Sequence, residues 1–260
     1  MTGKFPHVCF DRFLDSNEEQ MVARGAQRMA LLESKRWETR AEIPVGFAVG
    51  ATGQQKREAQ QAFEEWEKFA NVNFKFGTSQ QKVIKVSFDP RGGAWSMLGT
   101  DAIRTSNQTA TMNLGFNQAG TYLHEVGHAL GLIHEHQNPE GGMQWNREAV
   151  IRALSGPPNN WDRQTIENNM FRKYSRNQIN GTQLDPRSIM MYAFPASWTT
   201  NGFGTKQNAV LSETDKSHIA KLYPGRFEPA PIDTDPISPK KSNWFWEFVA
   251  DLIRAWRDAK

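Results

Sequence analysis

The spacing of apolar residues predicts that much of the chain is helical. The clearest case follows Thr52, where apolar side chains recur about every 3.6 residues and Lys, Glu and Gln occupy the positions between them. Thr52 is suited to cap this helix, because its hydroxyl can accept a backbone hydrogen bond from the first turn. The apolar positions are Ala59, Ala62, Phe63, Trp66 and Ala70. The same spacing predicts helices over residues 17–32, 146–154, 162–171 and 212–222.

Strands are predicted where apolar residues alternate or form short runs between the helices. Such segments cover residues 43–49, 72–76, 83–88 and 111–114. Adjacent glycines instead predict a flexible turn over residues 92–96. The succession of helix, strand and strand predicts an α/β arrangement in which the helix after Thr52 covers a sheet.

The stretch TYLHEVGHALGLIHEH combines the side chains that a catalytic zinc site needs. His124 and His128 are four residues apart, so on a helix both imidazoles lie on one face. Gly131 can end that helix at positive φ, which allows His134 to approach the same ion as a third ligand. A fourth position then stays open for water, and Glu125 is placed to take a proton from that water.

Two alternatives to a catalytic site stay open for this motif. A chance match to HExxH is the first, and it becomes rare once Gly131 and His134 are added to the pattern. A purely structural zinc site is the second, but such sites usually have four protein ligands and are rich in cysteine. Because the chain has one cysteine, the motif favours a hydrolytic site.

The sequence HEVGHALGLIH fits HExxHxxGxxH, so this stretch resembles the zinc signature of the metzincin metallopeptidases. The following Glu135 and His136 extend the resemblance to the HExxHxxGxxHE form of the astacins. Farther along the chain, Ser188 to Tyr192 is similar to the S-x-M-x-Y motif of that family. The resemblance covers residues 36–224, which we expect to be an astacin-like catalytic domain.

This resemblance implies an α+β fold with two lobes. The upper lobe would hold a mixed twisted sheet and two long helices, and the lower lobe would be mostly irregular with a C-terminal helix. The resemblance also implies one catalytic Zn²⁺ ion as cofactor, bound by His124, His128 and His134. Met190 would form the Met-turn beneath the metal, and the Tyr192 hydroxyl would reach toward it.

The implied activity is that of a zinc metalloendopeptidase that acts on proteins or peptides. Glu125 would be the general base, and Tyr192 would help to hold the oxyanion. The strand over residues 111–114 would be the sheet edge that pairs with an extended substrate, and Glu135 would contact the N-terminus of the mature enzyme. The alternative is a zinc-containing, non-catalytic binding module that docks a partner or a membrane through the C-terminal end of the chain.

Composition and charge narrow the classes of protein and function that remain possible. The chain has 260 residues and 38% hydrophobic content, so it can bury a core and is expected to be one domain with appendages. Its net charge is +3, and the basic residues are scattered among acidic ones, so nucleic-acid binding is not expected. Neither an apolar run of membrane-spanning length nor the apolar core of a secretory signal is present. Export by an unmarked route and a cytoplasmic location both stay open, and nothing indicates the oligomeric state.

The sole cysteine, Cys9, lies in residues 1–35, which precede the region of resemblance and are expected to be a pro-like segment. One cysteine excludes an internal disulfide, and Ala94 stands where the GCWSxxG motif of the astacins has cysteine. A thiolate binds zinc well, so Cys9 could close the open position and keep the enzyme latent, with Asp11 as the carboxylate alternative. A small buried or inert cysteine is the other interpretation.

The C-terminal end of the chain has a different composition. Five prolines between residues 224 and 239 predict a semi-rigid linker over residues 225–242. Residues 243–260 then place aromatic and aliphatic side chains on one face of a predicted helix. Charges of both signs on its polar face favour docking on protein over a membrane surface, because helices that lie in membrane interfaces prefer Lys and Arg there.

Overall fold

The structure is a computed structural model that describes residues 9, 35–77, 82–117, 120–138, 142–157, 159–172 and 184–226. The chain divides into two compact units, residues 1–228 and 229–260, and every described residue belongs to the first unit. Asp11, the helix predicted over residues 17–32, nearly all of the predicted linker and the helix predicted over residues 243–260 lie outside the described residues.

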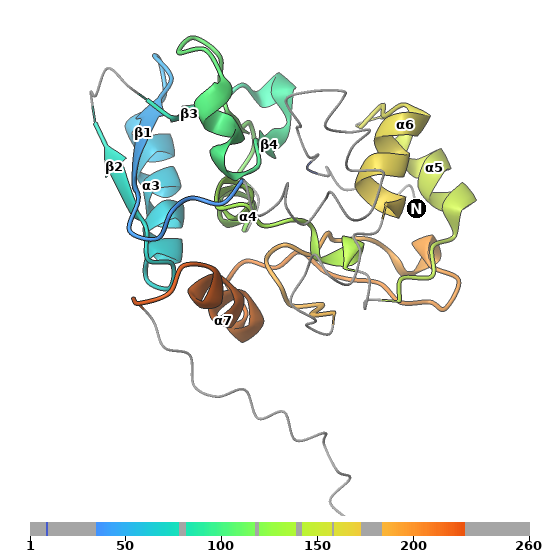
Figure 1. Ribbon diagram of the computed structural model, residues 1–260. Coiled ribbons are helices and arrows are strands. Elements are labelled where there is room, and N and C mark those ends of the chain that lie inside the picture. Colours follow the sequence, from blue (N-terminus) through green and yellow to red (C-terminus); the bar gives the residue numbers. More distant parts are fainter. Residues whose placement is uncertain are drawn as a thin grey trace, which may run out of the picture. The chain divides into compact units, whose positions relative to one another are not determined.

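Five strands form one mixed sheet in the left half of Figure 1, which corresponds to the upper lobe of the predicted fold. They are β1 (Glu42–Phe47), β2 (Asn73–Phe76), β3 (Ile84–Ser87), β4 (Ala94–Ser96) and β5 (Met112–Leu114), and their order in the sheet is β2-β1-β3-β5-β4. β4 runs antiparallel to β5, and the other pairings are parallel. The helices α3 (Gly53–Glu67) and α4 (Thr121–Ala129) pack against each other beside the sheet. This mixed sheet with its helices confirms the predicted α+β class.

α3 begins and packs as its sequence predicts. The Thr52 hydroxyl accepts a hydrogen bond from the Gln55 backbone N–H, and the Gln55 side chain accepts one from the Thr52 N–H, so the helix starts with a complete capping box. Its apolar stripe is buried, and the Phe63 ring meets Phe74 of β2 edge to face at a centroid distance of 4.7 Å. The stripe therefore fixes α3 on the sheet.

Two predictions about the sheet edge are wrong. Residues 92–96 are predicted to be a flexible turn, but Ala94–Ser96 form β4. The strand over residues 111–114 is predicted to be the edge, whereas β5 lies between β3 and β4, and β2 and β4 are the edge strands of the described sheet. β4 has only three residues, and it exists because it pairs with β5, a partner distant in sequence. No local pattern can reveal such a strand.

The lower lobe is built from short helices and irregular segments. Its elements are the 3-10 turn η3 (Glu135–Gln137), α5 (Arg147–Leu154), α6 (Arg163–Ile166), the π-helical turn η5 (Glu167–Phe171), the 3-10 turn η7 (Ala196–Trp198) and α7 (Glu213–Leu222). Two 3-10 turns, η1 (Pro90–Gly92) and η2 (Gly99–Arg104), belong to the upper lobe. The side chains of Asn146, Asp162 and Ser212 cap these helices. The helix predicted over residues 162–171 is confirmed as far as Ile166 and then widens into η5.

Each lobe has its own apolar core. The larger core joins the sheet, α3 and α4, and α7 belongs to it through Ile219 and Tyr223. The smaller core surrounds α5, α6 and η7, and it includes Tyr192 and the isolated Cys9. The ribbon of the lower lobe thus returns to the upper lobe through α7 (Figure 1). Tyr192 lies where the two cores approach each other.

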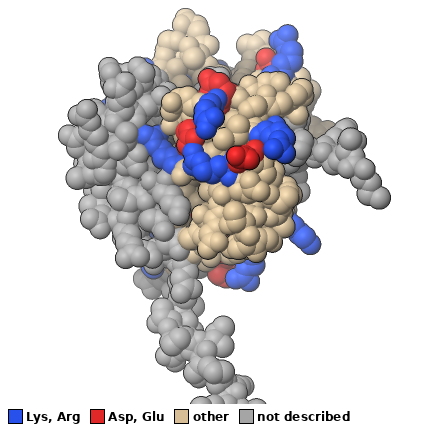
Figure 2. All heavy atoms as spheres, turned by 90° about the vertical axis from the view of Figure 1, so that its right-hand side faces the viewer, with Lys and Arg blue, Asp and Glu red and all other residues tan. Residues whose placement is uncertain are grey.

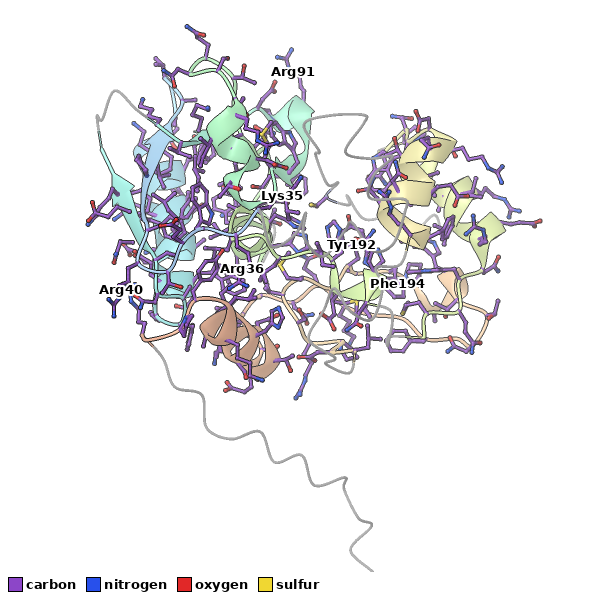
Figure 3. All side chains as sticks on the ribbon, viewed as in Figure 1. Lys35, Arg36, Arg40, Arg91, Tyr192 and Phe194 are labelled. Atoms are coloured by element: carbon purple, nitrogen blue, oxygen red, sulfur yellow. The ribbon has the colours of Figure 1, made fainter. Side chains whose placement is uncertain are left out.

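Residues 35–37, the first described residues after Cys9, pack closely against the upper lobe. Lys35 is 2% exposed, its ammonium lies 2.5 Å from an Asp101 carboxylate oxygen, and its backbone carbonyl accepts a hydrogen bond from the Thr100 N–H. The Arg36 side chain donates to the Leu222 carbonyl, and the Trp37 indole donates to the Ala129 carbonyl. Lys35 and Arg36 lie close to α4 in the view of Figure 3. Lys35 therefore packs as part of the upper lobe.

Charges of both signs are interspersed on the face that carries α5 and α6 (Figure 2). Arg147 of α5 forms an ion pair with Glu167 of η5, and its guanidinium carbon lies 4.0 Å from the centre of the Phe171 ring. The described residues of this face present no continuous positive surface. In the part of the chain that the structure describes, no helix is long and apolar enough to cross a membrane.

Candidate metal centre and active site

α4 carries the first two histidines, and two glycines determine where it begins and ends. Gly120 precedes the helix at φ +82°, and a Cβ atom there would lie 2.0 Å from the Asn208 carbonyl oxygen, so only glycine fits. Gly131 follows the helix at φ +90°, as predicted. The chain then turns back and brings His134 toward His124 and His128.

The three histidines meet at one point. The Nε2 atom of His128 lies 3.1 Å from Nε2 of His124 and 3.0 Å from Nε2 of His134. Imidazoles that bind zinc at about 2.0–2.1 Å in tetrahedral geometry place their nitrogens about 3.3 Å apart. The three predicted ligands therefore converge at nearly the spacing that one zinc ion requires.

Backbone carbonyls select the tautomer of two of these histidines. His124 Nδ1 lies 2.7 Å from the Ile189 carbonyl oxygen, and His128 Nδ1 lies 2.8 Å from the Leu132 carbonyl oxygen. A carbonyl only accepts, so each Nδ1 carries the hydrogen and each Nε2 directs its lone pair toward the centre. These outer hydrogen bonds are typical of metal-binding histidines, and they support a metal at this point.

Cys9 lies at the fourth corner of the cluster. Its Sγ atom is 3.5 Å from Nε2 of His128 and 3.6 Å from Nε2 of His134. A tetrahedral zinc with Zn–S of about 2.3 Å and Zn–N of about 2.05 Å places sulfur and nitrogen about 3.6 Å apart. Cys9 is 8% exposed, and its position matches that of a fourth zinc ligand.

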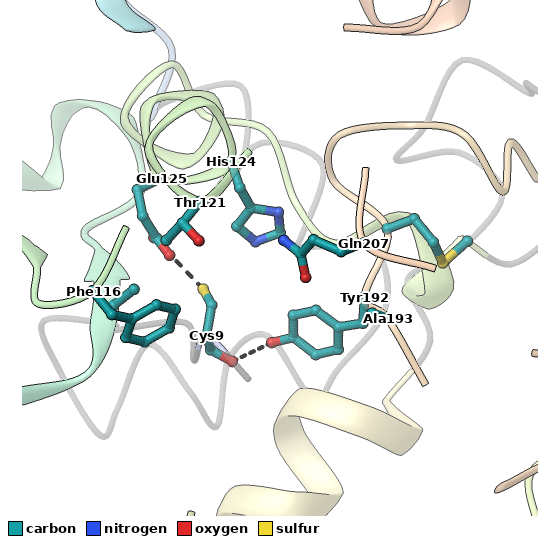
Figure 4. A pocket seen from close by; sticks show the side chains of 10 residues that line it. Cys9, Phe116, Thr121, His124, Glu125, Tyr192, Ala193 and Gln207 are labelled. Carbon is teal, nitrogen blue, oxygen red and sulfur yellow. Dashed lines mark hydrogen bonds between the residues drawn. The ribbon is translucent and has the colours of Figure 1, made fainter. Parts of the chain in front are cut away.

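Glu125 and Tyr192 face the same corner from opposite sides (Figure 4). The Glu125 side chain is fully buried, and its Oε2 atom lies 3.6 Å from Cys9 Sγ. The Tyr192 hydroxyl donates a hydrogen bond to the Cys9 carbonyl oxygen. A peptide carbonyl thus already occupies the place toward which the Tyr192 hydroxyl points.

Several side chains that line this site are absent from the predicted set. Phe116, Thr121 and Gln207 surround the pocket beside Cys9, which holds about 30 Å³ of free space. This volume is enough for only a water molecule or two. Phe116 and Gln207 come from separate segments, so no sequence spacing groups them with the motif. Thr121 lies one turn before His124 and Glu125 on α4, and helical spacing could have found it.

His136 is a further residue that the predicted set gives no role. Its ring stacks on Tyr192 at a centroid distance of 4.5 Å, and its Nε2 atom lies 2.8 Å from the Asn169 carbonyl oxygen of η5. The His134 ring contacts Tyr192 from another side at 4.2 Å. The one sequence signal is that His136 follows the predicted ligand His134 by two residues. His136 lies in the 3-10 turn η3, so this spacing alone does not predict where its ring points.

Glu135 points away from the three histidines. Its backbone N–H donates to the Met190 carbonyl at 3.0 Å, and its carboxylate accepts hydrogen bonds from the Asp185 N–H and the Asn138 amide. Burial raises the pKa of Glu135 to about 7.

Met190 lies against α4, and its sulfur would be 2.4 Å from a Cβ atom at Gly127. A larger residue at position 127 would therefore displace the Met190 side chain.

Comparison with known proteins identifies the family. Residues 30–223, which are well over half of the chain, match the model of the peptidase family described as Astacin. The chain belongs to the astacin family. Astacins are a family of zinc peptidases, and the histidine cluster of this chain could bind one zinc ion as cofactor.

Curated relatives of this astacin are longer proteins. The chain is 28% identical over 186 residues to tolloid-like protein 1 of Homo sapiens, covering 70% of this chain and 16% of the relative. It is 27% identical over 215 residues to zinc metalloproteinase nas-13 of Caenorhabditis elegans, covering 76% of this chain and 43% of the relative. The chain thus spans less than half the length of these curated relatives.

Solved structures of astacin fold resemble this chain over a larger share of their own length. The structure of myroilysin shares 37% sequence identity at a TM-score of 0.71 and covers 75% of this chain and 98% of that chain. A second crystal structure of myroilysin shares 33% identity at a TM-score of 0.61 and covers 86% of this chain and 93% of that chain. These similarities support the astacin fold through both lobes.

Proposed function

We propose that this astacin is a zinc-dependent endopeptidase in which His124, His128 and His134 hold the metal and Glu125 is the general base. The observation that carries the proposal is the convergence of three imidazole Nε2 atoms beside one buried carboxylate. When bound, zinc supplies Lewis acidity, which lowers the pKa of the attacking water toward about 7 and polarises the scissile carbonyl.

The protein's own groups then move the protons. Glu125 accepts a proton from the water as the new C–O bond forms at the scissile carbonyl, and it then hands that proton to the amine nitrogen as the peptide C–N bond breaks. Tyr192 donates its hydroxyl hydrogen to the developing oxyanion. The hydrogen bond from Tyr192 to the Cys9 carbonyl supports this role, because the hydroxyl is within reach of a peptide oxygen at the site.

We further propose that the full-length chain is a latent zymogen in which Cys9 is the zinc switch. The spacing of Sγ from His128 and His134 suits a thiolate in the fourth ligand position, and the same sulfur stands against the Glu125 carboxylate. Cys9 would therefore exclude the attacking water and block the base together. This geometry favours the zinc switch over an inert buried cysteine. Asp11 is the alternative zinc ligand if Cys9 does not bind the metal.

Activation would remove the segment that carries Cys9. Lys35 is buried against Asp101, so we place the boundary just before Lys35, with the catalytic domain continuing to residue 224 and the linker and C-terminal helix following it. The new α-ammonium group would pair with the buried Glu135 carboxylate, as the family resemblance implies. Such a pair would compensate the charge of a carboxylate that burial otherwise disfavours.

The competing proposal, a zinc-containing binding module, predicts no turnover. The test is digestion of casein and of an internally quenched peptide blocked at both ends, by the chain before and after limited proteolysis removes residues 1–34. We expect cleavage of internal bonds, loss of activity with a zinc chelator, and recovery when one equivalent of zinc is returned. Activity that survives the chelator would contradict the zinc mechanism, and a zinc-loaded, trimmed chain without any cleavage would favour the binding module.

A further inference from the structure

A buried carboxylate at the start of α7 holds the turn beneath the histidines. Asp215 is 5% exposed, and its Oδ1 atom accepts a hydrogen bond of 2.6 Å from the Ser188 hydroxyl. Its Oδ2 atom accepts one of 2.8 Å from the Ile189 backbone N–H. The two oxygens of one carboxylate therefore clamp two consecutive residues of the turn.

The clamped turn is in direct contact with the first predicted zinc ligand. The carbonyl of Ile189, the residue whose N–H is held by Asp215, accepts the Nδ1 hydrogen of His124 at 2.7 Å. The Ser188 hydroxyl accepts a further hydrogen bond from the Met190 N–H at 3.0 Å, which tightens the same turn. A continuous chain of short hydrogen bonds thus runs from Asp215 through Ile189 to His124.

The same carboxylate also closes the cap of α7. Its Oδ2 atom accepts from the Ser212 N–H at 2.8 Å, while the Ser212 hydroxyl accepts from the Asp215 N–H at 3.1 Å. Burial raises the pKa of Asp215 and so opposes its ionisation, whereas three donors and the positive end of the helix dipole favour the charged form. A fully bonded buried network of this kind is rigid.

We propose that Asp215 is a positioning residue for the zinc site, which acts by fixing the Ile189 carbonyl and thereby the tautomer and orientation of His124. The inference rests on the proposed role of His124 as a ligand. Without the clamp, the Ile189 carbonyl is free to shift, and His124 loses the partner that directs its Nε2 lone pair at the metal. Loss of an outer hydrogen-bond partner of a metal ligand typically weakens metal binding by about 10–100-fold.

The test separates this role from helix capping. Zinc affinity of the full-length chain is measured by competition with a chromophoric chelator, and the cobalt-substituted protein gives a visible absorption spectrum that reports ligand geometry. Asp215→Asn should weaken zinc binding by about 10–100-fold and change the cobalt spectrum. The matched control is Ser212→Ala, which removes the capping hydroxyl but leaves the bonds to Ser188 and Ile189 intact. It should lower the unfolding midpoint by roughly 2–4 °C with zinc affinity and cobalt spectrum unchanged.

Zinc affinity of Asp215→Asn within twofold of the parent, with a lowered unfolding midpoint, would overturn the proposal and leave Asp215 as a helix cap only. If Asp215→Asn does not fold, Ser188→Ala is the second test of the proposal, because this variant removes one of the two hydrogen bonds between the Asp215 carboxylate and the turn. A loss of zinc affinity of threefold or more in Ser188→Ala supports the proposal, and an unchanged affinity overturns it. A parent chain that binds no zinc would instead overturn the metal site itself, and with it this inference.

Discussion

Replacing Cys9 by serine tests whether the full-length chain is latent. The substitution keeps the size and the backbone of residue 9, so the hydrogen bond from Tyr192 to the Cys9 carbonyl can persist. It removes the thiolate, whose sulfur lies at ligand distance for a zinc held by His128 and His134. A neutral hydroxyl is a much poorer zinc ligand, so water should be able to displace it.

The magnitude follows from the contacts that are lost. Treated conservatively as one charge-assisted interaction, the bond between thiolate and metal is worth about 1.5–3 kcal/mol. Each 1.4 kcal/mol changes an equilibrium tenfold, so the open fraction should rise by about 10–100-fold. Full-length Cys9→Ser should exceed the activity of the full-length parent by that factor, since activity follows the open population.

The assay measures initial rates on a quenched peptide for the parent and Cys9→Ser, before and after removal of residues 1–34. After removal, the two proteins are identical and should have equal rates, which controls for differences in folding and zinc content. The Cys9 thiol of the parent should also react slowly with an alkylating reagent and faster once zinc is withdrawn. Equal full-length rates together with a freely reactive thiol and unchanged zinc content would refute the switch, and Asp11 would be tested next.

Three further predictions concern single residues. Tyr192→Phe should lower kcat by about 10–10³-fold with KM nearly unchanged, because the hydroxyl acts in the transition state; a raised KM with unchanged kcat would make Tyr192 a substrate-binding residue. His134→Ala should weaken zinc binding by more than the ~10–100-fold of an outer-shell loss, and equilibrium dialysis showing unchanged zinc content would place the third ligand elsewhere. Burial, together with the charges of Lys221 and Arg36, lowers the pKa of His218 to about 4, so the neutral imidazole stabilises the fold above pH 6.5 and this contribution is lost as pH falls through 4. Between pH 7 and pH 4.5 the unfolding free energy of the parent should therefore fall by about 2 kcal/mol more than that of His218→Gln, measured by urea denaturation, and equal falls would contradict the shifted pKa.

The sequence predicts best those features that depend on local chemistry. The α3 stripe, the caps of α5, α6 and α7, and the stop at Gly131 all follow from side chains and backbone preferences within a few residues. The convergence of the histidines follows from helical spacing and one glycine. Each of these features has a sequence signal made of residues that are close together in the chain.

The features that the sequence does not predict depend on contacts between distant segments. β4 exists only as the partner of β5, so its three residues give no recognisable pattern and the sheet edge is misplaced. The hydrogen bond between Asp215 and Ile189 also joins distant segments. The sequence shows that Asp215 can cap α7, but it does not show that Asp215 bonds to the turn at Ile189. Cys9 is predicted only in part. Its thiol chemistry suggests a zinc ligand, but the sequence does not show that the folded chain brings Cys9 to the three histidines.

The central claim is that a metal-activated water loses its proton to Glu125, and one measurement tests it most directly. In the chain freed of residues 1–34, Glu125→Gln keeps the size of the side chain and removes only its basicity. We expect one equivalent of bound zinc, an unchanged unfolding midpoint and a kcat/KM lower by at least ~10³-fold, which corresponds to about 4 kcal/mol of transition-state stabilisation. Turnover close to that of the parent, with zinc still bound, would contradict it.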